Sequence, residues 1–423
     1  MATTSSNHSS PTPAPTPLVA VLALTFLGSL GTGAVTNGFS FIAAEGLGYG
    51  RKMNLLLALI LGATYIVGAL VAGRLVTKLA LHKTTLTPKA LLAIALLIIA
   101  LACQLPILAQ HFAPDQTERA LWIFIIIFSP ATGIFWPIVE GYLSGGRSGK
   151  QLRSAIGRFN IVWSSALVLS FWAMAPLLGH NPFLIISLLG ILQLLMCIVL
   201  HWFPSHPPTH LPEHHEPHPD IYIPLLTMFR VMLIASYIVL SALAPLLPIV
   251  EDKLGVDVHW KTPLASAWLS SRVVLFIFFE RWHGWHGKWW TPWTGMGLML
   301  LGFSACMLSP IANNFGLATL MIGLLIMGVG IAITYYGALY YAMAVGNAQT
   351  DQQVNTSAKH EAVIGLGYTL GPICGLAGLG ISDGDPDSFR IWVILLVSAS
   401  VVVSTLLGWA LIRRDRSKPT NAS

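Results

Sequence analysis

Long apolar runs are the feature that most limits what this chain can fold into. A helix that crosses the hydrocarbon core of a bilayer needs about 20 mostly apolar residues, and about twelve segments of the 423-residue sequence approach or exceed that length. Only 9% of the residues are charged, whereas soluble domains carry about 25%. The sequence therefore predicts an all-α integral membrane protein with about twelve transmembrane helices. The predicted spans are 18–43, 53–75, 88–110, 120–143, 155–178, 182–203, 223–250, 263–282, 293–312, 315–345, 360–382 and 390–412.

A polar segment rich in His and Pro divides these spans into two sets of six. Its prolines exclude a regular helix, so we interpret residues 204–221 as a cytoplasmic linker. Residues 1–17 contain no Lys or Arg and are interpreted as a disordered N-terminal tail rather than a cleaved signal peptide. The predicted organisation is a 1–17 tail, an 18–203 six-helix bundle, the 204–221 linker, a 222–413 six-helix bundle and a 414–423 tail.

The basic residues are distributed unevenly between the two faces of this predicted topology. With a cytoplasmic N-terminus, 15 of the 23 Lys and Arg residues fall on the cytoplasmic side and six on the other. Arg230 and Arg272 remain inside spans. Because cytoplasmic loops are enriched in Lys and Arg, this asymmetry supports an even number of spans, with both termini in the cytoplasm. The short tails favour a bacterial inner membrane.

Two parallel repeats of six spans are a known plan for transporters, with the substrate bound between them near the midplane. The halves share weak sequence similarity, such as Ser154-Ala155 and Ser357-Ala358 at the start of the fifth and eleventh spans. The sequence therefore predicts two pseudo-symmetric six-helix bundles.

The loop predicted after the second span carries the most local motif. Residues 73–83 read GRLVTKLALHK and are similar to the Gly-x-Leu-x-Asp-Arg-x-Gly-Arg-Arg loop of the major facilitator superfamily. Gly73 and Leu75 match that pattern, and Lys78 stands at a basic position, whereas Thr77 stands where the family has Asp. With its six-plus-six organisation, the chain resembles this family, which implies a monomeric secondary transporter of a small organic solute that works by alternating access.

Ionisable side chains inside spans are costly and are therefore candidates for function. Arg272 lies midway along the eighth predicted span. Since guanidinium groups bind carboxylate or phosphate through two parallel hydrogen bonds, Arg272 is a candidate substrate anchor. The alternatives are a structural ion pair and, if the span is shifted, a side chain that extends to the membrane interface.

Four further residues near the predicted cytoplasmic ends of spans are candidates for gating or proton coupling. They are Glu140, Arg158, His360 and Glu361. Glu140 and Arg158 belong to adjacent helices and are expected to pair, and Arg158 could also meet Glu361 across the halves. A buried Glu361 with His360 could take up and release a proton. The alternatives are a hairpin-fixing ion pair and a stabilised helix start.

Polar and aromatic side chains within the spans are candidate substrate contacts, because aromatic rings with a polar tip suit a small organic solute. These candidates are Asn37, Trp136, Asn160, Trp163, Tyr237, Tyr336 and Tyr340. Helix packing and interfacial belts are the alternative interpretation.

Several classes of function are not supported by the sequence. We expect no enzyme activity, metal site or cofactor, because no nucleophile–base or metal-ligand cluster occurs within the spans. Nucleic-acid binding is not expected either, since no dense basic stripe lies on a polar face. The expected partners are the lipid bilayer, a small-molecule substrate and, in a coupled mechanism, protons. An uncoupled facilitator and a non-transporting receptor or scaffold on the same fold remain open as alternatives.

Overall fold

The structure is a computed structural model that describes residues 14–82, 86–208, 218–345 and 353–416. Every regular element among them is helical. The first half contains α1 (Leu18–Gly31), the π-helix η1 (Thr32–Asn37), α2 (Phe39–Leu47), α3 (Arg51–His82), α4 (Pro88–Ala102), α5 (Leu105–Phe112), η2 (Pro114–Gln116), α6 (Thr117–Ser144), α7 (Gly149–Leu178), α8 (Pro182–Val199) and η3 (Leu200–Trp202). The second half contains α9 (Tyr222–Leu243), α10 (Leu247–Lys253), α11 (Val258–Ala265), α12 (Ala267–Arg281), α13 (Trp290–Leu308), η4 (Ser309–Ile311), η5 (Asn313–Phe315), α14 (Gly316–Val345), α15 (Gln353–Ile381) and α16 (Pro386–Arg416).

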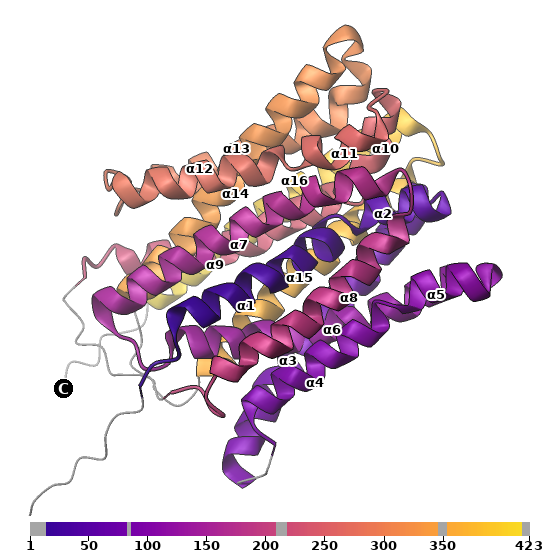
Figure 1. The fold of residues 1–423 in the computed structure, drawn as a ribbon. Helices are drawn as coiled ribbons and strands as arrows, with labels where there is room; N and C mark the ends of the chain where they lie inside the picture. The colour runs from indigo at the N-terminus through magenta and orange to yellow at the C-terminus, as the bar shows by residue number, and fades with distance from the viewer. Residues whose placement is uncertain (1–13, 83–85, 209–217, 346–352, 417–423) are drawn as a thin grey trace, which may run out of the picture.

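Twelve helical stretches among the described residues are long and apolar enough to cross a membrane. The prediction of an all-α protein with twelve spans is therefore confirmed. Figure 1 shows the long helices running side by side, with α4 and α5 along one margin of the bundle and α12 and α13 along the other. The eighth span begins at Val258, five residues before the predicted start, because α11 and α12 together cover it.

Two ends of the bundle can be distinguished. We call the end where α1, α7, α9 and α15 begin the linker end, because the chain passes there from the sixth span to the seventh. The end that carries α2 and α10 is the opposite end. Since the number of spans is even, α1 begins and α16 finishes at the linker end.

The two halves meet along α3 and α15, where glycines permit close approach. A methyl group added at Gly62 on α3 would lie 2.7 Å from the backbone carbon of Tyr368 on α15. A methyl group added at Gly365 on α15 would lie 2.7 Å from the side-chain Cγ1 atom of Ile66 on α3. A side chain at either position would push the helices apart, so these glycines set the spacing between the halves.

Further contacts join the halves at both ends of the bundle. At the opposite end, the hydroxyl of Ser40 donates a hydrogen bond of 2.8 Å to the carbonyl oxygen of Ala244. At the linker end, Gly141 on α6 packs against Val354 on α15. The space between these contacts is where both halves contribute side chains to one cavity.

Two expectations about segments outside the spans require correction. Residues 14–17 are not a disordered tail: Thr16 is 1% exposed, and Arg147 donates a hydrogen bond to its carbonyl oxygen. Residues 73–82, expected in a loop, continue α3 as a helix. Part of the predicted linker, residues 209–217, lies outside the described part of the chain. The side chain of Lys78 in the family motif lies outside it as well.

Candidate functional site

A central cavity lies between the halves and holds about 480 Å³ of empty space, including its open side. Its walls come from η1, α3, α6 and α7 of the first half and from α9, α14 and α15 of the second. The lining side chains are Thr32, Thr36, Tyr65, Trp136, Glu140, Phe159, Trp163, Tyr237, Tyr335, Glu361, Ile364 and Tyr368. A cavity built by both halves is where a small organic ligand would contact both at once.

Two acidic side chains meet in this cavity. Glu361 on α15 is 8% exposed and accepts a hydrogen bond from the hydroxyl of Tyr65 on α3. Glu140 on α6 lies within hydrogen-bonding reach of both Ser357 and Glu361. Because adjacent carboxylates repel each other strongly away from water, this arrangement can bind a proton between two acids contributed by different halves of the chain.

Arg272 on α12 is the buried cation of the site. It is 1% exposed, and its guanidinium carbon lies 4.4 Å from the ring centre of Trp163 and 4.3 Å from that of Tyr335. Among the described residues, its Nε and Nη2 atoms have no hydrogen-bond partner, and Tyr237 is close enough to interact with the guanidinium electrostatically. Buried guanidinium donors normally have partners, so these two free donors are suited to an acceptor supplied by a ligand.

Aromatic rings surround the charged groups. The rings of Trp163 on α7 and Tyr335 on α14 are nearly parallel, with centroids 5.9 Å apart and an interplanar angle of 12°. Tyr368 packs edge-on against both Tyr237, at 5.1 Å, and Tyr65, at 6.2 Å. The cavity therefore offers flat apolar surfaces beside one cation and two acids.

Several residues singled out from the sequence lie at this cavity. Trp136, Glu140, Trp163, Tyr237 and Glu361 line it, and Arg272 stacks against its aromatic wall.

Asn37 lies nearby but in a different space. It belongs to the π-helix η1 and lines a second cavity of about 460 Å³. That cavity shares Thr36 and Tyr368 with the central one, so the two spaces adjoin. Irregular π turns inside helices are frequent at functional sites.

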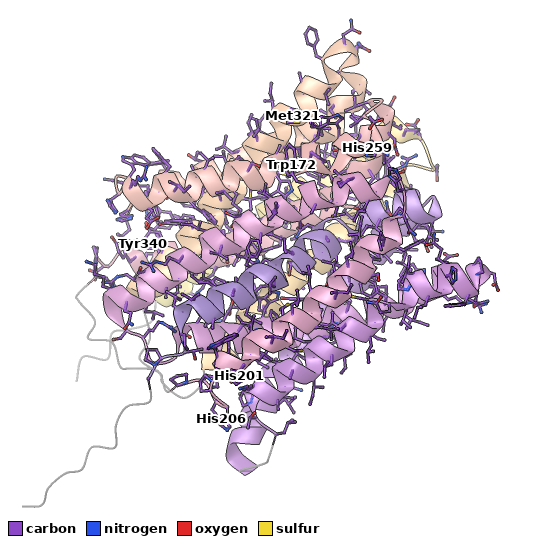
Figure 2. The ribbon with its side chains drawn as sticks, in the orientation of Figure 1. Trp172, His201, His206, His259, Met321 and Tyr340 are labelled. Atoms are coloured by element: carbon purple, nitrogen blue, oxygen red, sulfur yellow. The ribbon has the colours of Figure 1, made fainter. Side chains whose placement is uncertain are left out.

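Other candidates lie away from the cavity. Asn160 donates to the carbonyl oxygen of Ile156 on its own helix. Tyr336 and Tyr340 pack around Trp285, and Figure 2 shows Tyr340 near the linker end of the bundle.

The expected partners of Arg158 are not found in the structure. Arg158 is exposed, and the ion pairs observed among the described residues include none between it and Glu140 or Glu361. His360 is also exposed, while the neighbouring Glu361 faces the cavity. The structure thus joins Glu140 to Glu361 directly, without the arginine that we expected between them.

Sequence reasoning missed three tyrosines that shape the site: Tyr65, Tyr335 and Tyr368. Each is a polar-tipped aromatic residue inside an apolar span, and this signal was available from the sequence. Among the described residues, no group of three His, Cys, Asp or Glu side chains is placed to hold a metal ion.

The sequence matches the model of the Major Facilitator Superfamily over residues 21–372. The chain belongs to this family, and the fold, the twelve spans and the cavity between the halves agree with that membership. It is a membrane transporter by family and fold. Comparison of the sequence with curated proteins finds no match.

Solved transporters share the fold at low sequence identity. A bacterial homologue of the human lysosomal transporter Spinster, inward-facing and unoccupied, is 13% identical with a TM-score of 0.62 over 95% of this chain and 98% of that chain. The nucleoside transporter NupG is 12% identical with a TM-score of 0.61 over 95% of this chain and 99% of that chain. At this identity the likeness concerns the fold alone.

Proposed function

We propose that the protein is a proton-coupled secondary transporter of a small organic anion with a planar ring. The observation that carries the proposal is Arg272, which is buried against the rings of Trp163 and Tyr335, with two guanidinium nitrogens unpaired among the described residues. A carboxylate would accept from those donors. A planar ring attached to it would lie against the aromatic wall.

The balance of charge in the cavity would couple anion binding to proton binding. Without substrate, one negative charge shared by Glu140 and Glu361 balances the positive charge of Arg272. Tyr237 interacts electrostatically with all three of these groups, which supports their acting together. Because a bound anion would compete with the ionised pair for the same cation, protonation of the pair favours anion binding. Uptake of the anion therefore carries a proton with it.

The cavity also bears on the two rival functions. A receptor or scaffold does not need a polar cavity lined by both halves, so the presence of the central cavity favours transport over these functions. An uncoupled facilitator does not need two acids in contact, so the Glu140–Glu361 contact supports coupling. For orientation, we propose that the linker end is cytoplasmic in a bacterial inner membrane and that the protein acts as a monomer. Reporter fusions at residues 80 and 150 should then report the same side.

A matched pair of probes tests the substrate class. Benzoate and benzamide share a flat ring but differ in charge, so benzoate should raise the melting temperature of the purified protein and benzamide should not. Uridine provides a neutral nucleoside for comparison, because one structural relative is a nucleoside transporter. Stabilisation by uridine or benzamide without any effect of benzoate would contradict the anion assignment.

Proteoliposome uptake tests the coupling. An inward proton gradient should drive accumulation of the stabilising anion by the unmodified chain, and Glu361→Gln should abolish the dependence on the gradient. Glu280→Gln is the control, because Glu280 is an exposed acid on α12 outside the cavity. Undiminished gradient-driven uptake by Glu361→Gln would refute the coupling role.

A further inference from the structure

A cluster of charges joins the halves at the opposite end, far from the central acids. Lys261 on α11 is 4% exposed and pairs with two carboxylates. One belongs to Glu45 on α2 of the first half. The other belongs to Asp252 on α10 of the second half, with 2.5 Å between Nζ and Oδ1. Lys261 therefore forms a bridge between the halves, which we call the Lys261 bridge.

A third acid lies beside this bridge and has no partner. Glu251 on α10 is fully buried, and neither of its carboxyl oxygens has a hydrogen-bond partner among the described residues. The buried hydroxyl of Thr262, next to Lys261 in the sequence, is also unpartnered. Burial raises the pKa of Glu251 well above its usual value, and Lys261 opposes that shift only in part.

The charged groups around Glu251 explain why it stays unpaired. Of the elements packed against α10, α2 carries Glu45 and α11 carries Lys261 and His259, while α10 itself carries Asp252 and Lys253. The thiol of Cys306 on α13 also interacts electrostatically with Glu251, and η4 contributes no titratable side chain. Lys261 already has two carboxylate partners, so ionising a third acid in this buried cluster would leave its charge uncompensated.

We propose that Glu251 is a second proton-binding site, and that its proton holds the two halves together at the opposite end. Separation of the halves removes Glu45 from Lys261, because these residues belong to different halves. Glu251 can then lose its proton to water and replace Glu45 as a partner of Lys261. The exchange breaks the ion pair between Lys261 and Glu45 and the O–H bond of Glu251, releases one proton to water and forms the ion pair between Lys261 and Glu251.

The direction of the pH effect follows from this exchange. The joined state binds one proton more than the separated state, so acid favours the joined state and alkali favours separation. With one linked proton, the ratio of separated to joined molecules changes by up to about tenfold per pH unit. This site acts independently of the proposed coupling at Glu140 and Glu361.

A distance measurement between spin labels tests the proposal on the full chain. His111→Cys, near the end of α5, and Asn314→Cys, in η5, place labels at exposed positions of different halves at the opposite end. Cys197→Ser and Cys374→Ser remove the two partly exposed native thiols and retain the buried ones. Glu140→Gln with Glu361→Gln removes the central acids as a source of pH dependence. In this background the long-distance population should increase between pH 5 and pH 8.5, and adding Glu251→Gln should keep the distance short at every pH.

Two controls separate Glu251 from its neighbours. Asp115→Asn changes an exposed acid at the same end and should leave the pH response intact. His259, labelled in Figure 2, is the other titratable group on α11 besides Lys261, with its Nδ1 3.2 Å from the carbonyl oxygen of Ala175. His259→Gln should therefore retain the response. Persistence of the response in Glu251→Gln, or its loss in His259→Gln, would overturn the proposal.

Glu45→Gln provides a second test if Glu251→Gln does not fold. Removing the carboxylate of the first half leaves more of the Lys261 charge available to Glu251, so Glu251 should ionise at lower pH. The midpoint of the distance change, measured in the same labelled background without the central acids, should therefore move to more acidic pH. An unchanged midpoint would overturn the proposal.

Discussion

The hydroxyl of Tyr65 on α3 donates a hydrogen bond to the carboxyl group of Glu361 on α15, across the boundary between the two halves. Both residues line the central cavity. A conformational change that separates α3 from α15 must break this bond, and a change in the protonation of Glu361 alters its strength. The bond is therefore a direct physical link between proton binding and the relative position of the halves.

Tyr65→Phe tests this link while preserving the ring contact with Tyr368. A hydrogen bond to a charged group contributes about 1.5–3 kcal/mol, so its loss should reduce proton-driven accumulation by roughly tenfold or more. Proteoliposome uptake with and without a pH gradient provides the measurement. Tyr49→Phe is the matched control, because Tyr49 donates to Glu118 within the first half, 2.6 Å away. Equal effects of the two substitutions would argue against a specific role for Tyr65.

Arg272 provides the test of substrate recognition. Arg272→Lys keeps the charge but loses the planar, forked donors that bind a carboxylate bidentately. We expect Arg272→Gln to abolish the thermal stabilisation by benzoate and Arg272→Lys to weaken benzoate binding by at least about tenfold. Thermal unfolding with and without benzoate measures the first effect, and titration calorimetry with benzoate measures the second. Full benzoate affinity in Arg272→Gln would show that the anion binds elsewhere.

The spans were predictable because crossing a bilayer imposes a minimum length on apolar helices. The side chains that face the cavity were harder to predict, since these helices are apolar around most of their circumference. Tyr336 was predicted as a substrate contact, whereas Tyr335 lines the cavity. A shift of one residue rotates a helical side chain by about 100°, so a wrong choice between neighbours turns the prediction away from the site.

The partners of charged side chains were also difficult to predict. Glu140 was expected beside Arg158 because their helices are consecutive, but α15 brings Glu361 to Glu140 instead. Contacts between elements far apart in sequence depend on how the halves dock, and no local pattern encodes that docking. Trp136 and Glu140 lie four residues apart on one helix face, and both line the cavity.

Gly62→Ala tests whether close contact between α3 and α15 holds the halves in the observed arrangement. The added methyl group would lie 2.7 Å from the backbone of Tyr368, so it should destabilise this arrangement by about 1–3 kcal/mol. Spin labels at His111→Cys and Asn314→Cys should report a larger fraction of separated molecules. Gly297→Ala on α13 is the control, because no described atom beyond its chain neighbours and the nearby backbone of its own helix lies within 4 Å of the added methyl group. An unchanged distance distribution in Gly62→Ala would contradict this role.

His286, between α12 and α13, should make the folded protein sensitive to acid. Burial, with a smaller contribution from His283, lowers the pKa of His286 to about 4, and the Tyr340 hydroxyl lies 3.1 Å from its Nδ1. The ordinary value of an exposed His is about 6.5. Between these values the unfolded chain binds the proton and the folded chain does not, so stability falls as pH decreases from about 6.5 to about 4.

His286→Gln should remove this loss of folding stability at acid pH. Thermal unfolding should therefore show a smaller decrease in melting temperature between pH 7 and pH 5 for His286→Gln than for the unmodified protein. His111→Gln is the matched control, because His111 is an exposed imidazole at the opposite end. Each substitution removes one imidazole, so only the buried position should change the slope against pH. Parallel pH profiles for His286→Gln and the unmodified protein would show that another group causes the acid sensitivity.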